Sequence, residues 1–251
     1  MKKPFRIKHP YIAAILIALL CTFMTALGSA VPQIIGLDID MQLVVTTFFL
    51  IISVSIGLII IKKTNIKFFN YGFRMNEKNS YRKVWYYIPL ILIEIIPIAF
   101  VGFSSNITSM QYITLLFFTI AIGFNEEIYF RGIVFNFLLV KSRKIAIILS
   151  SVIFGILHLA NAFNGKNLVY LVLQVFFAFL VGIVLAEIVS VTKSLWLVII
   201  WHASHDYIAN ITGDNLDSKA LIALVLQVII LLIYSICIWK SSIDEKLVED
   251  K

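Results

Sequence analysis

Apolar residues occupy most of the chain in long runs, and short polar segments separate these runs. Eight runs come close to the roughly 20 residues that an α-helix needs to cross the hydrocarbon core of a bilayer. They lie at about 11–31, 42–62, 85–104, 110–138, 145–162, 168–190, 194–212 and 219–239. The pattern therefore predicts an all-α fold, a polytopic membrane bundle of about eight transmembrane helices.

The amino-acid composition supports this prediction. Of the 251 residues, 61% are hydrophobic and 14% are charged, and the mean hydropathy is +0.97. A soluble domain is nearer 45–50% apolar and about 25% charged. The eight runs leave no room for a sizeable soluble domain.

The distribution of basic residues predicts the orientation. If the N-terminus is cytoplasmic and the loops alternate, 18 of the 21 lysines and arginines fall on the cytoplasmic side. Only Lys166 and Lys219 fall outside, and Arg131 lies within a run. This excess follows the positive-inside rule and predicts that both termini are cytoplasmic. The net charge of +7 then reflects topology, so we expect no nucleic-acid partner.

Nine ionisable residues lie inside the apolar runs, where each costs about 2.5–3.5 kcal/mol at the bilayer centre. Seven of them fall in the fourth, fifth and seventh runs. The nine are Glu94, Glu126, Glu127, Arg131, His158, Glu187, His202, His205 and Asp206. At about 1.5 Å per helical residue, the three runs bring their polar groups to similar depths. The clustering predicts one shared cavity.

The fourth run contains the stretch "NEEIYFRG". Glu127 and Arg131 are four residues apart and lie on one helical face, in the order that favours an ion pair. Glu126 lies about 100° around the helix and is left for chemistry. The alternative from this stretch alone is a buried glutamate–arginine pair with no chemistry.

The fifth and seventh runs carry the histidines. His158 follows "SSVIFGIL", in which Ser151 and Gly155 would let another helix approach closely. In "WHASHDY", His202 and Asp206 are four apart and share a face, and His205 could join that face or lie at its edge. A lone intramembrane histidine is often a packing residue, but this second cluster is poorly explained by packing.

Together these residues form three motifs in order: Glu126-Glu127-x-x-x-Arg131, Phe154-x-x-x-His158 and His202-x-x-x-Asp206. The pattern resembles the CPBP intramembrane proteases, a family that groups CAAX prenyl endopeptidases with bacteriocin-processing and self-immunity proteins. The resemblance covers about 110–210. The resemblance predicts three regions in the chain. Residues 1–105 hold the first three helices and a basic loop at 62–84, residues 106–215 form a catalytic core, and residues 216–251 hold the last helix and a charged tail.

The resemblance implies a peptidase in which Glu126 activates water and His158 assists. His202 and Asp206 would hold the substrate carbonyl or its oxyanion, and Glu127 and Arg131 complete the candidate catalytic set. The third motif often ends in asparagine. An ionised Asp206 cannot donate a hydrogen bond, so it would have to be protonated or orient His202 instead.

The cofactor and the substrate are open at this point. The favoured mechanism requires no metal; the alternative is zinc held by Glu126, His158, His202 and Asp206, whose N and O atoms suit that ion. The expected partners are the lipid bilayer and a membrane-associated peptide, such as a bacteriocin, a pheromone precursor or an anchored peptide, rather than a prenylated CAAX protein. The expected location is a bacterial plasma membrane. Rival functions are a non-catalytic immunity factor or scaffold and a proton-coupled transporter.

Overall fold

The computed structural model describes residues 4–74, 87–165, 168–212 and 217–243. Within these ranges every regular element is helical. In chain order the elements are α1 (Phe5–Lys8), α2 (Pro10–Ile34), α3 (Ile39–Lys63), η1 (Phe68–Tyr71), α4 (Ile88–Phe100), α5 (Ser109–Glu127), η3 (Ile128–Val134), α6 (Phe135–Leu138), α7 (Arg143–Leu157), η4 (His158–Asn164), α8 (Leu168–Thr192), α9 (Trp196–Thr212) and α10 (Ser218–Ile243).

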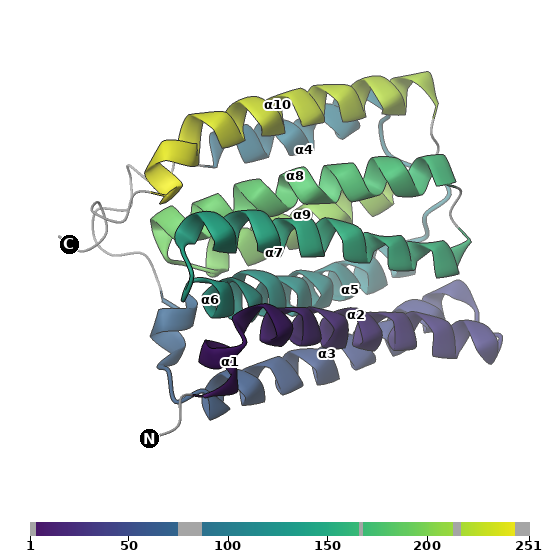
Figure 1. Cartoon of the computed structure of the whole chain (residues 1–251). Coiled ribbons are helices and arrows are strands. Elements are labelled where there is room, and N and C mark those ends of the chain that lie inside the picture. Colours follow the sequence, from purple (N-terminus) through teal and green to yellow (C-terminus); the bar gives the residue numbers. More distant parts are fainter. Residues whose placement is uncertain (1–3, 75–86, 166–167, 213–216, 244–251) are drawn as a thin grey trace.

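The long helices lie side by side in one bundle (Figure 1). α5 packs against α3 and α9, α7 packs against α8, and α10 packs against α8 and α4. The first helix and the end of the last helix lie at the same end of the bundle, here called the terminal end. The opposite end, where α2 passes into α3, is called the loop end.

Helix length supports most of the predicted crossings. Six segments are long and apolar enough to span a membrane: α2, α3, the continuous α5–η3–α6 segment, α7 with the start of η4, α8 and α10. The predicted all-α membrane bundle is therefore confirmed. α4 has 13 residues and α9 has 17, which is fewer than the roughly 20 of a full crossing. The total of about eight crossings stays a prediction.

Two glycines allow the close helix contacts that position the polar residues. A Cβ atom on Gly123 of α5 would lie 2.9 Å from the Ile199 carbonyl oxygen of α9. A Cβ atom on Gly155 of α7 would lie 2.9 Å from the Val175 carbonyl oxygen of α8. The close approach predicted for the Ser151–Gly155 face is confirmed, since small residues let membrane helices pack backbone to backbone.

The described part of the basic loop is docked on the terminal end. The Arg74 Nε donates to the Lys193 carbonyl at 2.7 Å, and the Leu195 amide donates to the Gly72 carbonyl at 2.9 Å. These bonds attach the loop to the connection between α8 and α9. Residues 75–84 of the predicted loop 62–84 lie outside the described residues, as does the tail at 244–251.

Candidate active site

Glu127 is the buried centre of the polar cluster. Its Oε1 accepts a hydrogen bond from the Arg131 Nη1 at 2.9 Å, and the His202 Nδ1 lies 2.6 Å from the same oxygen. All three side chains are almost completely buried. The predicted pairing of Arg131 with Glu127 is confirmed. The pair also does more than order its own helix, because it anchors α9 to α5.

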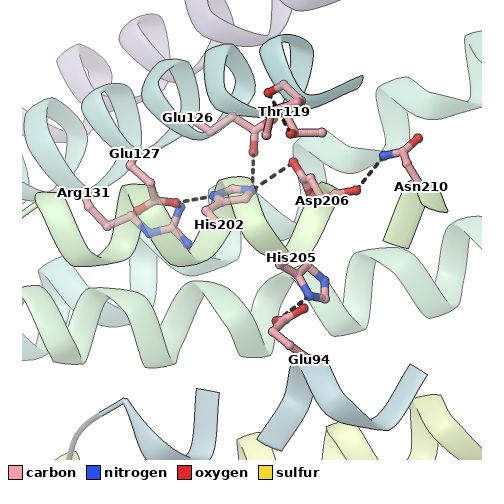
Figure 2. A network of polar contacts seen from close by, with 10 residues as sticks. Glu94, Thr119, Glu126, Glu127, Arg131, His202, His205, Asp206 and Asn210 are labelled. Carbon is pink, nitrogen blue, oxygen red and sulfur yellow. Dashed lines mark hydrogen bonds and ion pairs between the residues drawn. The ribbon is translucent and has the colours of Figure 1, made fainter. Parts of the chain in front are cut away.

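The other side of the His202 ring faces two further carboxylates. Its Nε2 lies 3.6 Å from the Glu126 Oε2 and 3.6 Å from the Asp206 Oδ2 (Figure 2). Glu126 and Asp206 keep 18% and 24% of their side-chain surface exposed, against 0% for Glu127. The imidazole therefore has one buried, anchored nitrogen and one nitrogen directed at the more accessible acids.

Hydrogen-bond chemistry assigns one proton on the ring of His202 and one on the ring of His158. Because the Glu127 oxygen already accepts from Arg131, it acts as an acceptor, and the His202 Nδ1 is the donor. The His158 Nδ1 lies 2.8 Å from the Phe154 carbonyl oxygen, which can only accept. Both rings therefore carry a proton on Nδ1, which leaves each Nε2 for chemistry.

The Phe154 ring connects the three motifs. The Arg131 guanidinium carbon lies 4.1 Å from its centroid, within the range of a cation–π contact. The His158 and His202 ring centroids lie 4.7 Å and 6.1 Å from it, both in edge-on geometry. The phenylalanine of the second motif is thus a wall that fixes the orientation of both histidines.

A cavity of about 120 Å³ brings Glu126 and His158 together. This volume holds several water molecules, and both residues supply polar atoms that water can contact. Phe130 and Phe154 line the same cavity, as does a row of residues from α2. Glu126 is thus shared between the cavity and the His202 cluster.

A π-helical segment follows the glutamates directly. η3 begins at Ile128 and ends at Val134, between the α-helical segments α5 and α6. Such segments occur often at functional sites, because one wider turn changes which side chains face a neighbouring helix. Arg131 lies inside this turn. The sequence carries no signal from which we could have predicted it.

The six predicted site residues lie together, whereas His205, the seventh ionisable residue of the three runs, does not join them. His205 points away from His202 and its Nδ1 lies 3.0 Å from the Glu94 Oε1 of α4 (Figure 2). The His205 ring is stacked between Trp201 and Phe177. Glu187 is fully buried in α8, and neither carboxylate oxygen has a hydrogen-bond partner among the described residues. His205 is close to His202 along α9, but its side chain leaves the helix on a different side and therefore does not reach Glu126 and Glu127.

Sequence reasoning missed the contribution of α2, because α2 contains no Asp, Glu, His, Lys or Arg residue. One face of it lines the cavity with Cys21, Thr22, Thr25, Ser29 and Gln33, interspersed with alanines. These polar residues recur every three or four positions, so the signal was present as a weak helical stripe. A buried amide attaches this helix to α5.

That amide belongs to Asn125, the residue before Glu126. Its Nδ2 donates to the Cys21 Sγ at 3.3 Å and to the Thr25 Oγ1 at 3.2 Å. The contact joins the cavity wall on α2 directly to the helix that carries the glutamates. The buried Cys21 is therefore a hydrogen-bond acceptor as well as a packing residue.

The arrangement of these residues does not fit the zinc alternative. Among the described residues, no group of three or more His, Cys, Asp or Glu side chains is placed to hold a metal ion. We therefore derive no chemical step through a metal.

Fold and site together define a multi-pass membrane protein with a polar cluster inside its helix bundle. Residues 108–208 match the family model described as Rce1-like, Type II CAAX prenyl endopeptidase Rce1-like. This segment runs from the cap of α5 almost to the end of α9, and it contains all six candidate residues. The resemblance to CPBP and CAAX proteases is confirmed for this segment, which is less than half of the chain. No curated protein matched the chain.

Proposed function

We propose that this protein is an intramembrane endopeptidase in which Glu126 activates a water molecule to hydrolyse a peptide bond. One observation carries the proposal: Glu126 lines a water-sized cavity with His158 and also lies 3.6 Å from the His202 Nε2. The matched family is one of proteases, which supports the reaction class. Three helices supply a base in Glu126, a second proton acceptor in His158 and an imidazole in His202. Such a set suits acyl transfer to water.

The chemical step follows from the donors and acceptors. The Glu126 carboxylate takes a proton from water, and the hydroxide attacks the carbonyl carbon of the substrate. The His158 Nε2 accepts a hydrogen bond from the same water and orients it. The tetrahedral intermediate then collapses, the C–N bond breaks, and Glu126 returns its proton to the leaving amine. The products are a carboxylic acid and an amine.

His202 supplies the stabilising group for the oxyanion. Three carboxylates surround this ring, Glu127 at Nδ1 and Glu126 and Asp206 at Nε2, and they favour the imidazolium, which donates from Nε2 as well as from Nδ1. In this role Asp206 positions the imidazole by attraction rather than donating to the oxyanion itself. A preorganised donor of this kind is worth about 10²–10³ in rate.

The substrate is a membrane-associated protein or peptide. We infer this class from the location of the cluster inside the bundle, among helices that are long and apolar enough to span a membrane. A bacteriocin, a pheromone precursor or an anchored peptide of a bacterial plasma membrane fits this class.

A glutamine substitution tests the proposal. We expect Glu126→Gln to reduce peptide cleavage by about 10²–10⁴-fold, the range for loss of a general base, at unchanged membrane abundance. The readout is peptidomics of intact cells, searched for an uncut precursor that accumulates. Glu187→Gln is the matched control, because it removes an intramembrane carboxylate that does not line the cavity, and it should leave cleavage unchanged.

The same pair of variants separates the rival functions. If Glu126→Gln leaves the cellular phenotype and all cleavage intact, the protein is a scaffold or immunity factor. If the variant instead stops flux of a solute while peptides are processed normally, the protein is a transporter. Either result contradicts the endopeptidase.

A further inference from the structure

The cavity opens toward one end of the bundle, as the exposure of the α2 residues that line it shows. Cys21 is buried, Thr25 and Ser29 are partly exposed, and Gln33 is exposed. Opposite them, exposure rises from the buried Phe154 to the partly exposed Asn161 of η4. The cavity therefore starts at the glutamates inside the bundle and reaches the surface at the loop end.

The other half of the same helices is packed with apolar side chains. Toward the terminal end, one hydrophobic cluster fills the space between α2, α6 and α7. Its members there are Ala14, Ala18, Phe135, Leu138, Ala146 and Ile147, all at most 3% exposed. Close-packed interiors leave no void for a peptide or a column of water. The site is thus closed on the terminal side.

The lining residues indicate what the open part accepts. Glu126 and His158 are the only ionisable groups among the residues that line it apart from the Cys21 thiol, and its walls otherwise offer hydroxyls, amides, alanines and the apolar side chains of Phe130, Phe154 and Leu157. Both amides of the lining are held in place by neighbouring side chains: the Gln33 Nε2 donates to the Ser29 Oγ at 2.9 Å and the Asn161 Nδ2 donates to the Gln174 Oε1 at 2.9 Å. An extended peptide within lipid needs such partners, because its backbone groups cannot be left unsatisfied.

We propose that the site receives an extended, uncharged peptide segment from the loop end, which faces the non-cytoplasmic side of the membrane. This rests on the proposed peptidase function and on the positive-inside orientation, since Lys62, Arg143, Lys193 and Lys240 all lie near the terminal end. The substrate is accordingly an exported peptide or the outer juxtamembrane segment of a membrane protein. A segment confined to the cytoplasm does not reach Glu126.

Cysteine accessibility tests the entry side without any substrate. In a Cys21→Ser, Cys237→Ser background, single cysteines are placed at Ser29 in the cavity, at Asn106 in the exposed α4–α5 loop and at Lys141 at the terminal end. A membrane-impermeant thiol reagent is applied to intact cells and to inside-out vesicles. We expect Ser29→Cys and Asn106→Cys to be labelled in cells, and Lys141→Cys only in inside-out vesicles. Labelling of Ser29→Cys only from the cytoplasmic side, or from neither side, would overturn the proposal.

A second measurement links access to turnover. We expect the labelled Ser29→Cys protein to lose at least about tenfold of its cleavage relative to the unlabelled protein, since a bulky group blocks the path, whereas labelled Asn106→Cys keeps its activity. Full activity of labelled Ser29→Cys would contradict the path. Failure of the peptidase proposal is separately visible, because Glu126→Gln would then retain cleavage whatever the labelling pattern.

Discussion

At the scale of single residues, Glu127 explains why two adjacent glutamates occur in an apolar helix. One carboxylate oxygen accepts hydrogen bonds from both Arg131 and His202. Burying one charge alone inside a protein is strongly unfavourable, and pairing with good geometry offsets that cost. Glu127 is thus occupied in holding the cluster together, and Glu126 beside it remains accessible to water.

The Glu127–Arg131 pair should show strong coupling. We expect Glu127→Gln or Arg131→Met alone to destabilise the protein by about 3–5 kcal/mol, because each leaves an uncompensated buried charge. The double variant should be less destabilised than the sum of the two. The measurement is a double-mutant cycle of thermal unfolding in detergent or nanodiscs. Additive effects of the two substitutions would contradict an energetic pairing.

Substitution of the two histidines of α9 should affect different properties, cleavage for His202 and stability for His205. We expect His202→Ala to reduce cleavage per folded molecule by at least about 100-fold, as expected for a group acting on the reacting atoms. His205→Ala should mainly lower stability, because it leaves Glu94 buried without its partner and removes a stacked ring.

The readouts are cleavage normalised to folded protein and the melting temperature of each variant. An equal loss of normalised cleavage in both variants would place His205 in the chemistry. That result would contradict its assignment to the Glu94 pair.

At the scale of helices, small residues determine how closely the elements of the site approach. Gly123 lies one turn before the glutamates, and it faces α9 at Ile199 and Ala203, which lie on either side of His202 in the chain. The backbone contact between α5 and α9 therefore sets the distance from Glu126 to the imidazole. Asn125 likewise sets the spacing between α5 and α2, through its hydrogen bonds to Cys21 and Thr25.

A larger side chain at position 123 should push α5 away from α9 and so increase the distance from Glu126 to His202. A Cβ there would already meet the Ile199 oxygen at 2.9 Å and the Ala203 Cβ at 3.0 Å. We expect Gly123→Leu to cost about 1–3 kcal/mol of stability and to lower cleavage by about 100-fold, since a displacement of about 1 Å has that effect. Ile113→Phe is the control, because its side chain is 52% exposed on the same helix.

The measurements are melting temperature and cleavage per folded protein for both variants. Normal cleavage in Gly123→Leu would show that the α5–α9 spacing does not position the site.

At the scale of the whole molecule, the site is assembled from segments far apart in the chain. The glutamates come from α5, His158 from the α7–η4 junction, and His202 and Asp206 from α9, while α2 supplies one cavity wall. Only packing of the complete bundle brings them together. The matched family segment, 108–208, does not include α2.

The complete molecule should work without a bound metal. We expect dialysis against a strong chelator to leave cleavage unchanged, because the described carboxylates and imidazoles are not grouped as a metal site. Elemental analysis of the purified protein should give much less than one zinc per chain. Stoichiometric zinc, or loss of activity that zinc restores, would contradict the glutamate mechanism.

Much of this protein follows from its sequence because some relations are local. Runs of apolar residues can only be stable as helices in lipid, where each backbone group must be bonded within its own segment. The fixed helical period places Glu127 beside Arg131 whatever surrounds them. The membrane fold, the ion pair and the list of six candidate residues could therefore be predicted.

Which helices are neighbours, and which side chains meet between them, was decided by tertiary packing alone. The helical period relates residues within one helix, but lipid-facing and protein-facing apolar surfaces look alike in sequence, so it does not say which helices become neighbours. The structure directs His205 to Glu94 rather than to the cluster, places Phe154 between the histidines, and makes α2 a wall of the cavity. The direction in which the cavity opens depends on how several helices fill one half of the bundle, which no single segment encodes.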